Sequence, residues 1–300
     1  MIKGRHQHKR AIHCRFLCTK VTSEENCRDF CYVGLGGAEI LKTSATKFDD
    51  GVAYEAWMGR WSRIVGEKFL TWLSPPQNLS WIDVGCGNGA FTELIHAKCD
   101  PSCIQGVDPS QEQLDVARSR VPSNTIEYKI GTAQALPLED NIVEVAAMAL
   151  AINLPPDPRE AVAEMMRVTK PGGIVATYMW DIPNGGITME PIRVALKEMG
   201  VDTPIFGETV TTPENMLELW QAAGLKDVSL TRIDITLSFK DFDEFWTSNT
   251  GTENTVVRAI KSLSDIDVET LKAKLRDRLI NGSQGGISYG AFTNAVRGQA

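Results

Sequence analysis

The sequence predicts an α/β fold built on a parallel, doubly wound sheet. From residue 81 to residue 179, short apolar runs that fit strands alternate with amphipathic segments that fit helices. This alternation is typical of parallel strands joined by helices. A glycine-rich turn at residues 85–89 follows the first apolar run. The run Val143–Leu150 is almost continuously apolar, as expected for a strand that is buried on both faces.

The elements before residue 181 follow in a regular order. The first is a helix over Val52–Leu73, whose apolar residues recur at helical spacing and which ends before Pro75. We expect this helix to cover a ligand pocket. The alternating elements that follow are the strand Trp81–Val84, the helix Ala90–Lys98, the strand Ile104–Val107, the helix Gln111–Arg120, the strands Thr125–Ile130 and Val143–Leu150, the helix Arg159–Val168 and the strand Ile174–Met179. Right-handed crossovers between such strands place ligands at the carboxyl ends of the strands.

The last third of the chain is expected to supply a lid and to complete the sheet. Glycine and proline turns interrupt the segment after the fifth strand, and we expect an insertion at about residues 181–225 to form a substrate lid. The elements expected in this third are helices at Ile192–Met199, Pro213–Ala223, Phe242–Trp246 and Val268–Leu279, a sixth strand at Asp227–Leu237 and a final antiparallel strand at Ile287–Val296.

Composition excludes several classes of protein. A chain of 300 residues with 43% hydrophobic content can bury a full core. The formal net charge of −7 argues against general nucleic-acid binding, which requires a basic surface. No apolar stretch reaches the roughly 18 residues of a membrane-spanning helix, because Glu144 interrupts the longest one, Ile142–Ile152. We therefore expect a cytoplasmic protein without a membrane span; oligomeric state is not encoded in a recognisable pattern.

Residues 1–47 differ from the rest of the chain. The first twenty residues hold six lysines or arginines and no acid, and no apolar segment of a secretory signal follows them. Two C-x3-C pairs lie within residues 14–31, close to His13. Zinc knuckles usually space their cysteines as C-x2-C or C-x4-C, so we expect no metal site. We expect a basic, poorly ordered extension over residues 1–47 and one folded domain over residues 48–300.

The glycine turn predicts a nucleotide-type ligand. Glycines at 85, 87 and 89 let the backbone turn sharply and let a ligand approach closely, and the following helix presents free N–H groups. The segment GCGNGA also fits the pattern of dinucleotide-binding turns. Asp83, two residues before the first glycine, would repel a pyrophosphate but suits an ammonium or sulfonium group. Asp83 therefore favours S-adenosylmethionine over a nicotinamide dinucleotide.

The second strand ends in another carboxylate. Asp108 stands at the strand end beside the glycine turn, where a carboxylate is placed to accept hydrogen bonds from both hydroxyls of a ribose. The same Asp-Pro-Ser segment is also a good start signal for the helix near Gln111. Ribose binding and helix capping are the two interpretations of Asp108.

Four ordered motifs resemble those of class I S-adenosylmethionine-dependent methyltransferases. They are Asp83–Gly89, Gly106–Ser110, Gly131–Pro137 and Arg167–Gly173. The similarity is closest to the small-molecule branch that is related to the ubiquinone and menaquinone C-methyltransferases. It implies a Rossmann-like sheet of seven strands with an antiparallel last strand, S-adenosylmethionine as cofactor, and methyl transfer to a small-molecule acceptor by direct in-line displacement.

The resemblance also implies a set of cofactor contacts. The backbone at Gly85 and Gly87 is expected to bind the methionine portion, and Thr132 begins the segment expected to line the adenine. Many relatives have aspartate at the position of Thr132, so the adenine contact is expected to be weaker or to use Gln134. The cofactor-binding residues implied by the resemblance are Asp83, Gly85, Gly87, Gly89, Asp108, Pro109, Thr132, Ala133, Gln134, Ala149 and Tyr54.

The segment Tyr54–Arg63, which precedes the first predicted strand, resembles a segment found in one group of these enzymes. This resemblance favours Tyr54 or Trp61 facing the cofactor. Ordinary helix packing explains the same aromatic residues equally well. His96 lies in the helix after the glycine turn, where a packing or surface role fits it best.

No general base stands out. Asn153 follows the fourth strand, and Tyr178 and Asp181 end the fifth; each can face a substrate, cap a turn or pack. The segment AINLPP lacks the signature of amino-methylating DNA enzymes, which disfavours DNA methylation. A catalytically silent binding module with the same fold is the alternative, motivated by Thr132 and by the lack of a base. A nicotinamide oxidoreductase ranks third.

Overall fold

The computed structural model describes residues 59–279 and 286–300 of the chain. The expectations for residues 1–47, a basic and poorly ordered extension with two C-x3-C pairs and no metal site, lie outside the described residues. Tyr54 lies outside them as well. Among the described residues, no helix is both long and apolar enough to cross a membrane.

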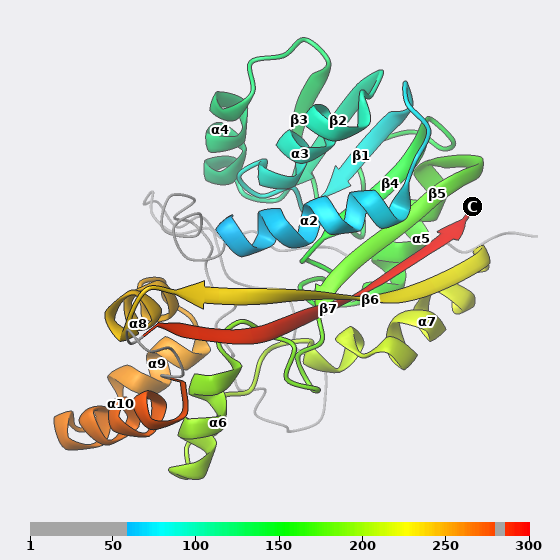
Figure 1. Ribbon diagram of the computed structural model, residues 1–300. Coiled ribbons are helices and arrows are strands. Elements are labelled where there is room, and N and C mark those ends of the chain that lie inside the picture. The colour runs from blue at the N-terminus through cyan, green and yellow to red at the C-terminus, as the bar shows by residue number, and fades with distance from the viewer. Residues whose placement is uncertain (1–58, 280–285) are drawn as a thin grey trace, which may run out of the picture. The chain divides into compact units, whose positions relative to one another are not determined.

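One sheet of seven strands forms the centre of the described domain (Figure 1), in the order β3-β2-β1-β4-β5-β7-β6. The strands are β1 (Ser80–Val84), β2 (Cys103–Asp108), β3 (Ile126–Ile130), β4 (Val143–Ala149), β5 (Thr169–Trp180), β6 (Lys226–Phe239) and β7 (Ile287–Gln299). Strands β1 to β5 pair in parallel, whereas β7 is antiparallel to both β5 and β6. The predicted doubly wound sheet with an antiparallel last strand is confirmed.

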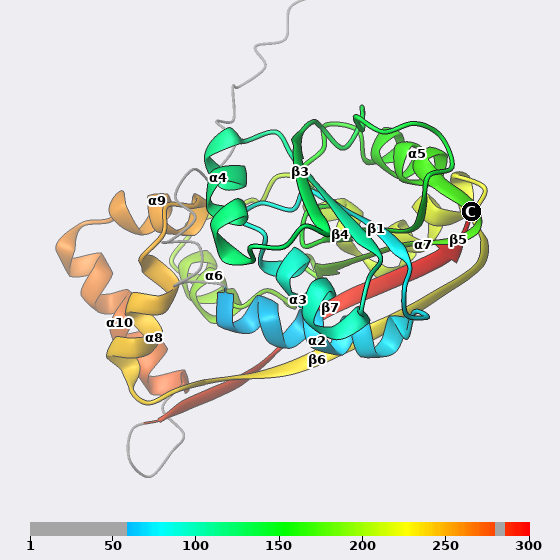
Figure 2. The same ribbon diagram turned by 90° about the horizontal axis from the view of Figure 1, so that it is seen from above.

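Helices cover both faces of this sheet. The described helices are α2 (Arg60–Leu73), α3 (Ala90–Cys99), α4 (Gln111–Arg120), α5 (Pro158–Val168), α6 (Glu190–Glu198), the 3-10 helix η2 (Glu208–Thr211), α7 (Pro213–Ala222), α8 (Phe242–Thr250), α9 (Thr255–Lys261) and α10 (Asp265–Leu279). Helix α3 packs against both α2 and α4 on one face, and α5 packs against α7 on the other (Figure 2). Helices α8, α9 and α10 lie beyond the end of β6, where β7 begins (Figure 1).

The central strands are apolar because both of their faces are covered. Every residue of β1 is buried, and Val145 to Met148 of β4 are almost fully buried. A strand between two helical layers has no solvent face, so its sequence does not alternate. The strand predicted over Val143–Leu150 ends one residue earlier, because Leu150 has a positive φ of 54° and leaves the sheet there.

Two parts of the second half differ from the expectation. Helix α9 was not predicted; Asn254 caps it by accepting a hydrogen bond from the N–H of Val257 at 3.0 Å. The segment Lys170–Gly173, expected to precede the fifth strand, instead belongs to β5 across an irregularity in its pairing with β4. Gly172 adopts a φ of 81° there and donates to the carbonyl of Ala300 at 2.8 Å. Pairing with the chain's last residues therefore extends the strand.

The strand order places the ligand site. Strand β1 lies between β2 and β4, so the chain reverses its winding direction between β1 and β4. The loops after these two strands diverge, and ligands of open α/β sheets bind in the resulting crevice.

Candidate functional site

A cavity of about 650 Å³ opens at the carboxyl ends of the strands. We call its lining residues between Gly59 and Gln134 the charged wall, and those between Met148 and Val256 the apolar wall. The charged residues of the described lining all belong to the charged wall; they are Arg63, Asp83, Glu93, Asp108 and Arg120. The described part of the apolar wall contains no charged side chain. One cavity therefore joins two chemically different surfaces.

Asp83 lies on β1 at the bottom of the charged wall, where it is fully buried. Its Oδ2 accepts a hydrogen bond from Thr92 Oγ1 at 2.6 Å, whereas its Oδ1 has no partner among the described residues. Burial raises the pKa of the Asp83 carboxyl to about 7; the hydrogen bond from Thr92 opposes the rise, and the charge of Asp108 adds to it. A buried carboxylate oxygen without a partner favours a cation in the cavity.

The glycine turn after β1 serves two purposes. Gly87 has a φ of 51°, and a Cβ on it would meet only the Oε1 of Gln113, at 3.9 Å. The turn is therefore open toward the cavity, where a ligand can approach the backbone. Gly89 has a φ of 79°, and a Cβ on it would lie 2.9 Å from the Cβ of Ala117. Gly89 thus allows α3 and α4 to pack closely.

Asp108 joins the glycine turn to the start of α4. Its Oδ2 accepts from the N–H of Gly87 and its Oδ1 from the N–H of Ser110, both at 2.9 Å. The side-chain cap of α4 is Ser110 itself, whose Oγ accepts from the N–H of Gln113 at 3.3 Å. Each carboxylate oxygen retains a second lone pair for a ligand hydroxyl. Capping by Ser110 and ligand binding by Asp108 are therefore compatible.

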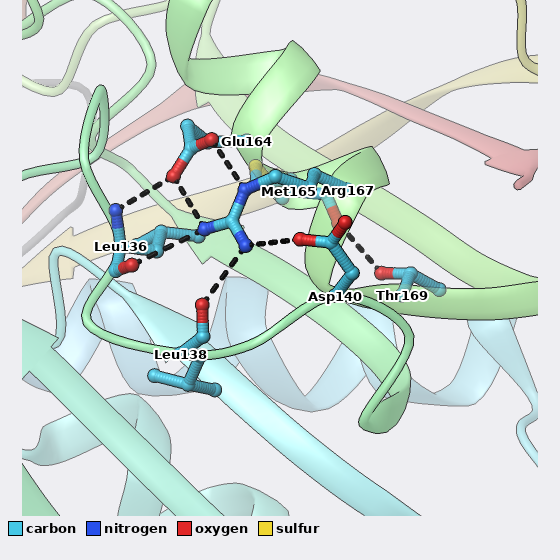
Figure 3. Close-up of polar contacts among 7 residues, drawn as sticks. All are labelled: Leu136, Leu138, Asp140, Glu164, Met165, Arg167 and Thr169. Atoms are coloured by element: carbon cyan, nitrogen blue, oxygen red, sulfur yellow. Dashed lines mark hydrogen bonds and ion pairs between the residues drawn. The ribbon is translucent and has the colours of Figure 1, made fainter.

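Thr132–Gln134, after β3, line the charged wall, and Arg167 holds the chain that follows them at Leu136 and Leu138 (Figure 3). The guanidinium of Arg167 donates to the carbonyls of Leu136 at 3.2 Å and Leu138 at 2.9 Å. It also forms an ion pair with Glu164, whose Oε2 accepts from the N–H of Leu136 at 2.9 Å. The position of this lining segment therefore depends on a side chain of α5.

The apolar wall gathers residues from segments far apart in the sequence. Its side chains from the end of β5, from the segment predicted as a lid and from α9 are Trp180, Ile182, Ile187, Met189, Ile205 and Val256. None of these is among the site residues expected from the sequence, although four of them lie in the expected lid at residues 181–225. Their spacing carries no local signal, because only the tertiary fold brings them together.

The three candidates for a catalytic role have different surroundings. Asn153 lines the cavity and is 5% exposed. Tyr178 also lines it, with its ring against that of Phe69 at a centroid distance of 4.6 Å. Asp181 is absent from the described lining; its carboxylate accepts hydrogen bonds from the Nδ2 of Asn184 at 3.0 and 3.1 Å. The structure brings Asn153 and Tyr178 to the cavity and leaves Asp181 in a turn.

Some of the remaining residues considered in the sequence analysis line the cavity, and others do not. Pro109 and Ala149 line the cavity. Trp61 does not; it is buried against Phe239, with ring centroids 5.7 Å apart. His96 lies half-buried in the last turn of α3, away from the described lining.

A pair of charged residues at the charged wall was missed from the sequence. Arg120 Nη1 lies 2.9 Å from Glu93 Oε2, and Arg120 Nε donates to the carbonyl of Asn88 at 2.8 Å. These contacts tie the end of α4 to the start of α3. Within residues 59–279 and 286–300, no cluster of three or more histidine, cysteine, aspartate or glutamate side chains is arranged to hold a metal ion.

Comparison with known proteins covers the region of the motifs. Residues 82–177 match the family model described as a methyltransferase domain. An uncharacterized methyltransferase of Mycobacterium tuberculosis is 36% identical over 146 residues, which cover 48% of this chain and 56% of that protein. The demethylmenaquinone methyltransferase of Bacillus pumilus is 33% identical over 113 residues, covering 36% of this chain and 48% of that protein. The chain thus spans about half the length of the curated relatives it matches.

Solved structures share the fold over a longer part of the chain. A putative methyltransferase from an antibiotic biosynthesis pathway of Anabaena variabilis aligns with a TM-score of 0.54 at 16% identity, covering 79% of this chain and 97% of that one. The expected similarity to methyltransferases is confirmed over the matched region, and the expected fold is confirmed by this alignment. Residues 82–177 are thus similar to a methyltransferase domain, and the motifs and strand order agree with those expected of class I S-adenosylmethionine-dependent methyltransferases.

Proposed function

We propose that this protein transfers a methyl group from S-adenosylmethionine to a small-molecule acceptor. The observation that carries the proposal is the division of one cavity into a charged wall and an apolar wall. A charged, sugar-bearing cofactor suits the first wall, and an acceptor of low polarity suits the second. The net charge of −7 supports a small molecule rather than a nucleic acid as acceptor.

The residues of the charged wall fit the cofactor. The unpartnered Oδ1 of Asp83 suits the ammonium of the methionine portion and would repel a pyrophosphate. Gly85 and Gly87 would receive the same portion at the glycine turn, which is open toward the cavity at Gly87, and Asp108 has lone pairs left for the ribose hydroxyls. Thr132–Gln134 would line the adenine, and Ala149 would lie near the sulfonium.

The cofactor would supply a methyl group bonded to a sulfonium: the acceptor's nucleophilic atom would bond in line to the methyl carbon as the carbon–sulfur electron pair passes to sulfur, and a proton lost by the acceptor would pass to solvent. The protein's residues hold the reacting atom of the acceptor on that line and exclude water. Alignment of this kind contributes up to about 7–11 kcal/mol. Tyr178 is the one described residue of the apolar wall with a titratable group, and its ring is fully packed. We infer that catalysis relies on positioning rather than on a dedicated base.

Titration calorimetry with S-adenosylmethionine and S-adenosylhomocysteine tests the cofactor. Binding of both ligands is expected, and a folded protein that binds neither would contradict the proposal. Transfer of a labelled methyl group into a metabolite extract then tests the reaction. An enzyme labels at least one small molecule.

A catalytically silent binding module is the second candidate. It is favoured by Thr132, which stands where many relatives carry aspartate, and by the lack of an acidic or basic side chain in the described apolar wall. Such a module binds S-adenosylhomocysteine in calorimetry but transfers no label to the extract. The two measurements together distinguish the candidates.

A further inference from the structure

Asn153 carries an unsatisfied polar atom in the apolar wall. Its Nδ2 donates to the carbonyl of Phe206 at 3.0 Å, whereas its Oδ1 is buried and has no hydrogen-bond partner among the described residues. The carbonyl of Phe206 can only accept, so the amide nitrogen must face it and the oxygen must point the other way. The orientation of the amide is therefore determined by its partner.

The backbone holds Asn153 in the same place. Gly207, in the predicted lid, has a φ of 64°, and a Cβ on it would lie 2.2 Å from the carbonyl oxygen of Asn153. The lid turn at Phe206 and Gly207 thus packs directly on Asn153, with one hydrogen bond and one close backbone contact. A side chain held from two sides keeps its Oδ1 at a constant position in the wall.

The other asparagine of the apolar wall, Asn254, is already engaged. Asn254 accepts from the N–H of Val257 and donates to the carbonyl of Thr252, so its amide caps α9. No acidic side chain of the described apolar wall could balance a cationic acceptor, and no basic one could balance an anionic acceptor. Leaving a buried carbonyl oxygen unpaired is unfavourable, so a ligand that donates to it gains affinity.

We propose that Asn153 Oδ1 selects the methyl acceptor: an uncharged, mostly apolar small molecule that carries one O–H or N–H group within reach of this atom. This inference rests on the proposed function, because it assigns the acceptor side of the same cavity. Asn153 binds the acceptor and does not remove its proton, since an amide oxygen is not a useful base. The apolar wall supplies most of the contact, and the single hydrogen bond supplies the orientation.

Three probes of similar shape test the proposal: 2-naphthol, naphthalene and 2-naphthoate. Binding of each to the full chain is measured by calorimetry or by tryptophan fluorescence, with and without saturating S-adenosylhomocysteine. We expect 2-naphthol to bind roughly tenfold more tightly than naphthalene, as one well-placed hydrogen bond provides. The charged 2-naphthoate should bind more weakly than 2-naphthol.

In the variant Asn153→Leu, the affinity for 2-naphthol should fall to about the affinity for naphthalene, so that their ratio is about one. Val256→Ala is the matched control, because it shortens an apolar side chain of the same wall and leaves Asn153 unchanged. This control variant should weaken the binding of both neutral probes by the same factor and so preserve the ratio of their affinities. A ratio that survives in Asn153→Leu would overturn the role of Asn153.

The unmodified protein also provides decisive outcomes. Equal affinity for 2-naphthol and naphthalene, tighter binding of 2-naphthoate, or no binding of any probe would overturn the proposed acceptor class. Binding of S-adenosylhomocysteine is measured separately. If the protein does not bind S-adenosylhomocysteine but prefers 2-naphthol, and this preference depends on Asn153, the result contradicts the proposed methyl donor and supports the acceptor site. Normal binding of S-adenosylhomocysteine without that preference contradicts the acceptor site alone.

Discussion

The charged wall and the apolar wall of the cavity are built in different ways. The charged wall comes from residues 59–134, where each strand end and the turn after it contribute in sequence order. The apolar wall comes from residues 148–256 and depends on loops, an inserted segment and the start of α9. Both walls meet at the carboxyl ends of the same parallel strands.

The matched family region covers the two walls unequally. It covers residues 82–177 and therefore contains most of the charged wall. Ile182, Ile187, Met189, Ile205 and Val256 of the apolar wall all lie beyond it. Most of the surface proposed for the methyl donor thus lies inside the matched region, whereas much of the surface proposed for the acceptor lies outside it. If the two walls serve two ligands, changes in one wall should leave the other ligand's affinity intact.

The largest effect is expected from Asp108→Ala in the charged wall. The change removes a carboxylate that orders the glycine turn and is proposed to bind the ribose. Loss of charged hydrogen bonds worth about 1.5–3 kcal/mol each should weaken S-adenosylhomocysteine binding on the order of a hundredfold. Calorimetry measures this affinity. The control Asp115→Ala changes an exposed carboxylate of α4 and should have no effect; equal affinities in both variants would remove Asp108 from the site.

A smaller effect, on methyl transfer rather than on donor binding, is expected from Ile187→Glu in the apolar wall. A carboxylate placed among apolar side chains is costly to desolvate, so labelled methyl transfer to the acceptor pool should fall roughly tenfold or more. Binding of S-adenosylhomocysteine should change less than about twofold, because the residue belongs to the other wall.

Val194→Glu is the matched control for Ile187→Glu, since Val194 lies on α6 with 40% of its surface exposed. It should leave both measurements unchanged. A parallel loss of donor binding and methyl transfer in Ile187→Glu would show that the walls do not act separately.

The pH dependence of donor binding should follow the ionisation of the Asp83 carboxyl. Burial raises the pKa of this carboxyl to about 7 in the free protein, so the acid is mostly protonated below that pH. Only the ionised form attracts an ammonium, and the affinity for S-adenosylhomocysteine should therefore rise up to about tenfold per unit between pH 5 and 7. In Asp83→Asn the affinity should be lower at pH 7 and nearly independent of pH. An unchanged slope in this variant would assign the titration to another group.

The smallest effect is expected from Arg167→Ala, which acts on the charged wall from behind. The guanidinium supports the backbone at Leu136 and Leu138 but does not line the cavity. Its loss should cost about 1–2 kcal/mol of unfolding free energy and weaken S-adenosylhomocysteine binding a few-fold. Denaturant unfolding and calorimetry measure the two effects. Arg159→Ala, on the exposed surface of α5, is the control; an unaltered donor affinity in Arg167→Ala would limit this residue to stability.

Much of the charged wall was predictable because its chemistry is local in sequence. Asp83, the glycines and Asp108 lie within 26 residues, over which a strand, a turn, a helix and a second strand follow one another. Glycine at positive φ and a carboxylate at a strand end each have few structural explanations. The roles of these residues as cofactor contacts remain a prediction that the variants above test.

The apolar wall was not predictable at the level of residues. Asn153 and Phe206 are 53 positions apart, and nothing in either segment indicates that they form a hydrogen bond. Asn153, Tyr178 and Asp181 were equivalent candidates in the sequence. Only side-chain packing separated them, because a strand-end residue can turn either to the cavity or to its own loop. The missed helix α9 has a good cap in Asn254, but its part in the cavity depends on tertiary contacts.

The sequence by itself determined the sheet, the order of its parallel strands and helices, and the class of cofactor. Hydrophobic periodicity and backbone stereochemistry act over a few residues, so they can be recognised without coordinates. The tertiary structure decided which polar groups are buried without a partner, which face the cavity, and which side chains meet across 50 or more positions. Those properties depend on burial and long-range contact, which have no short-range pattern in the chain.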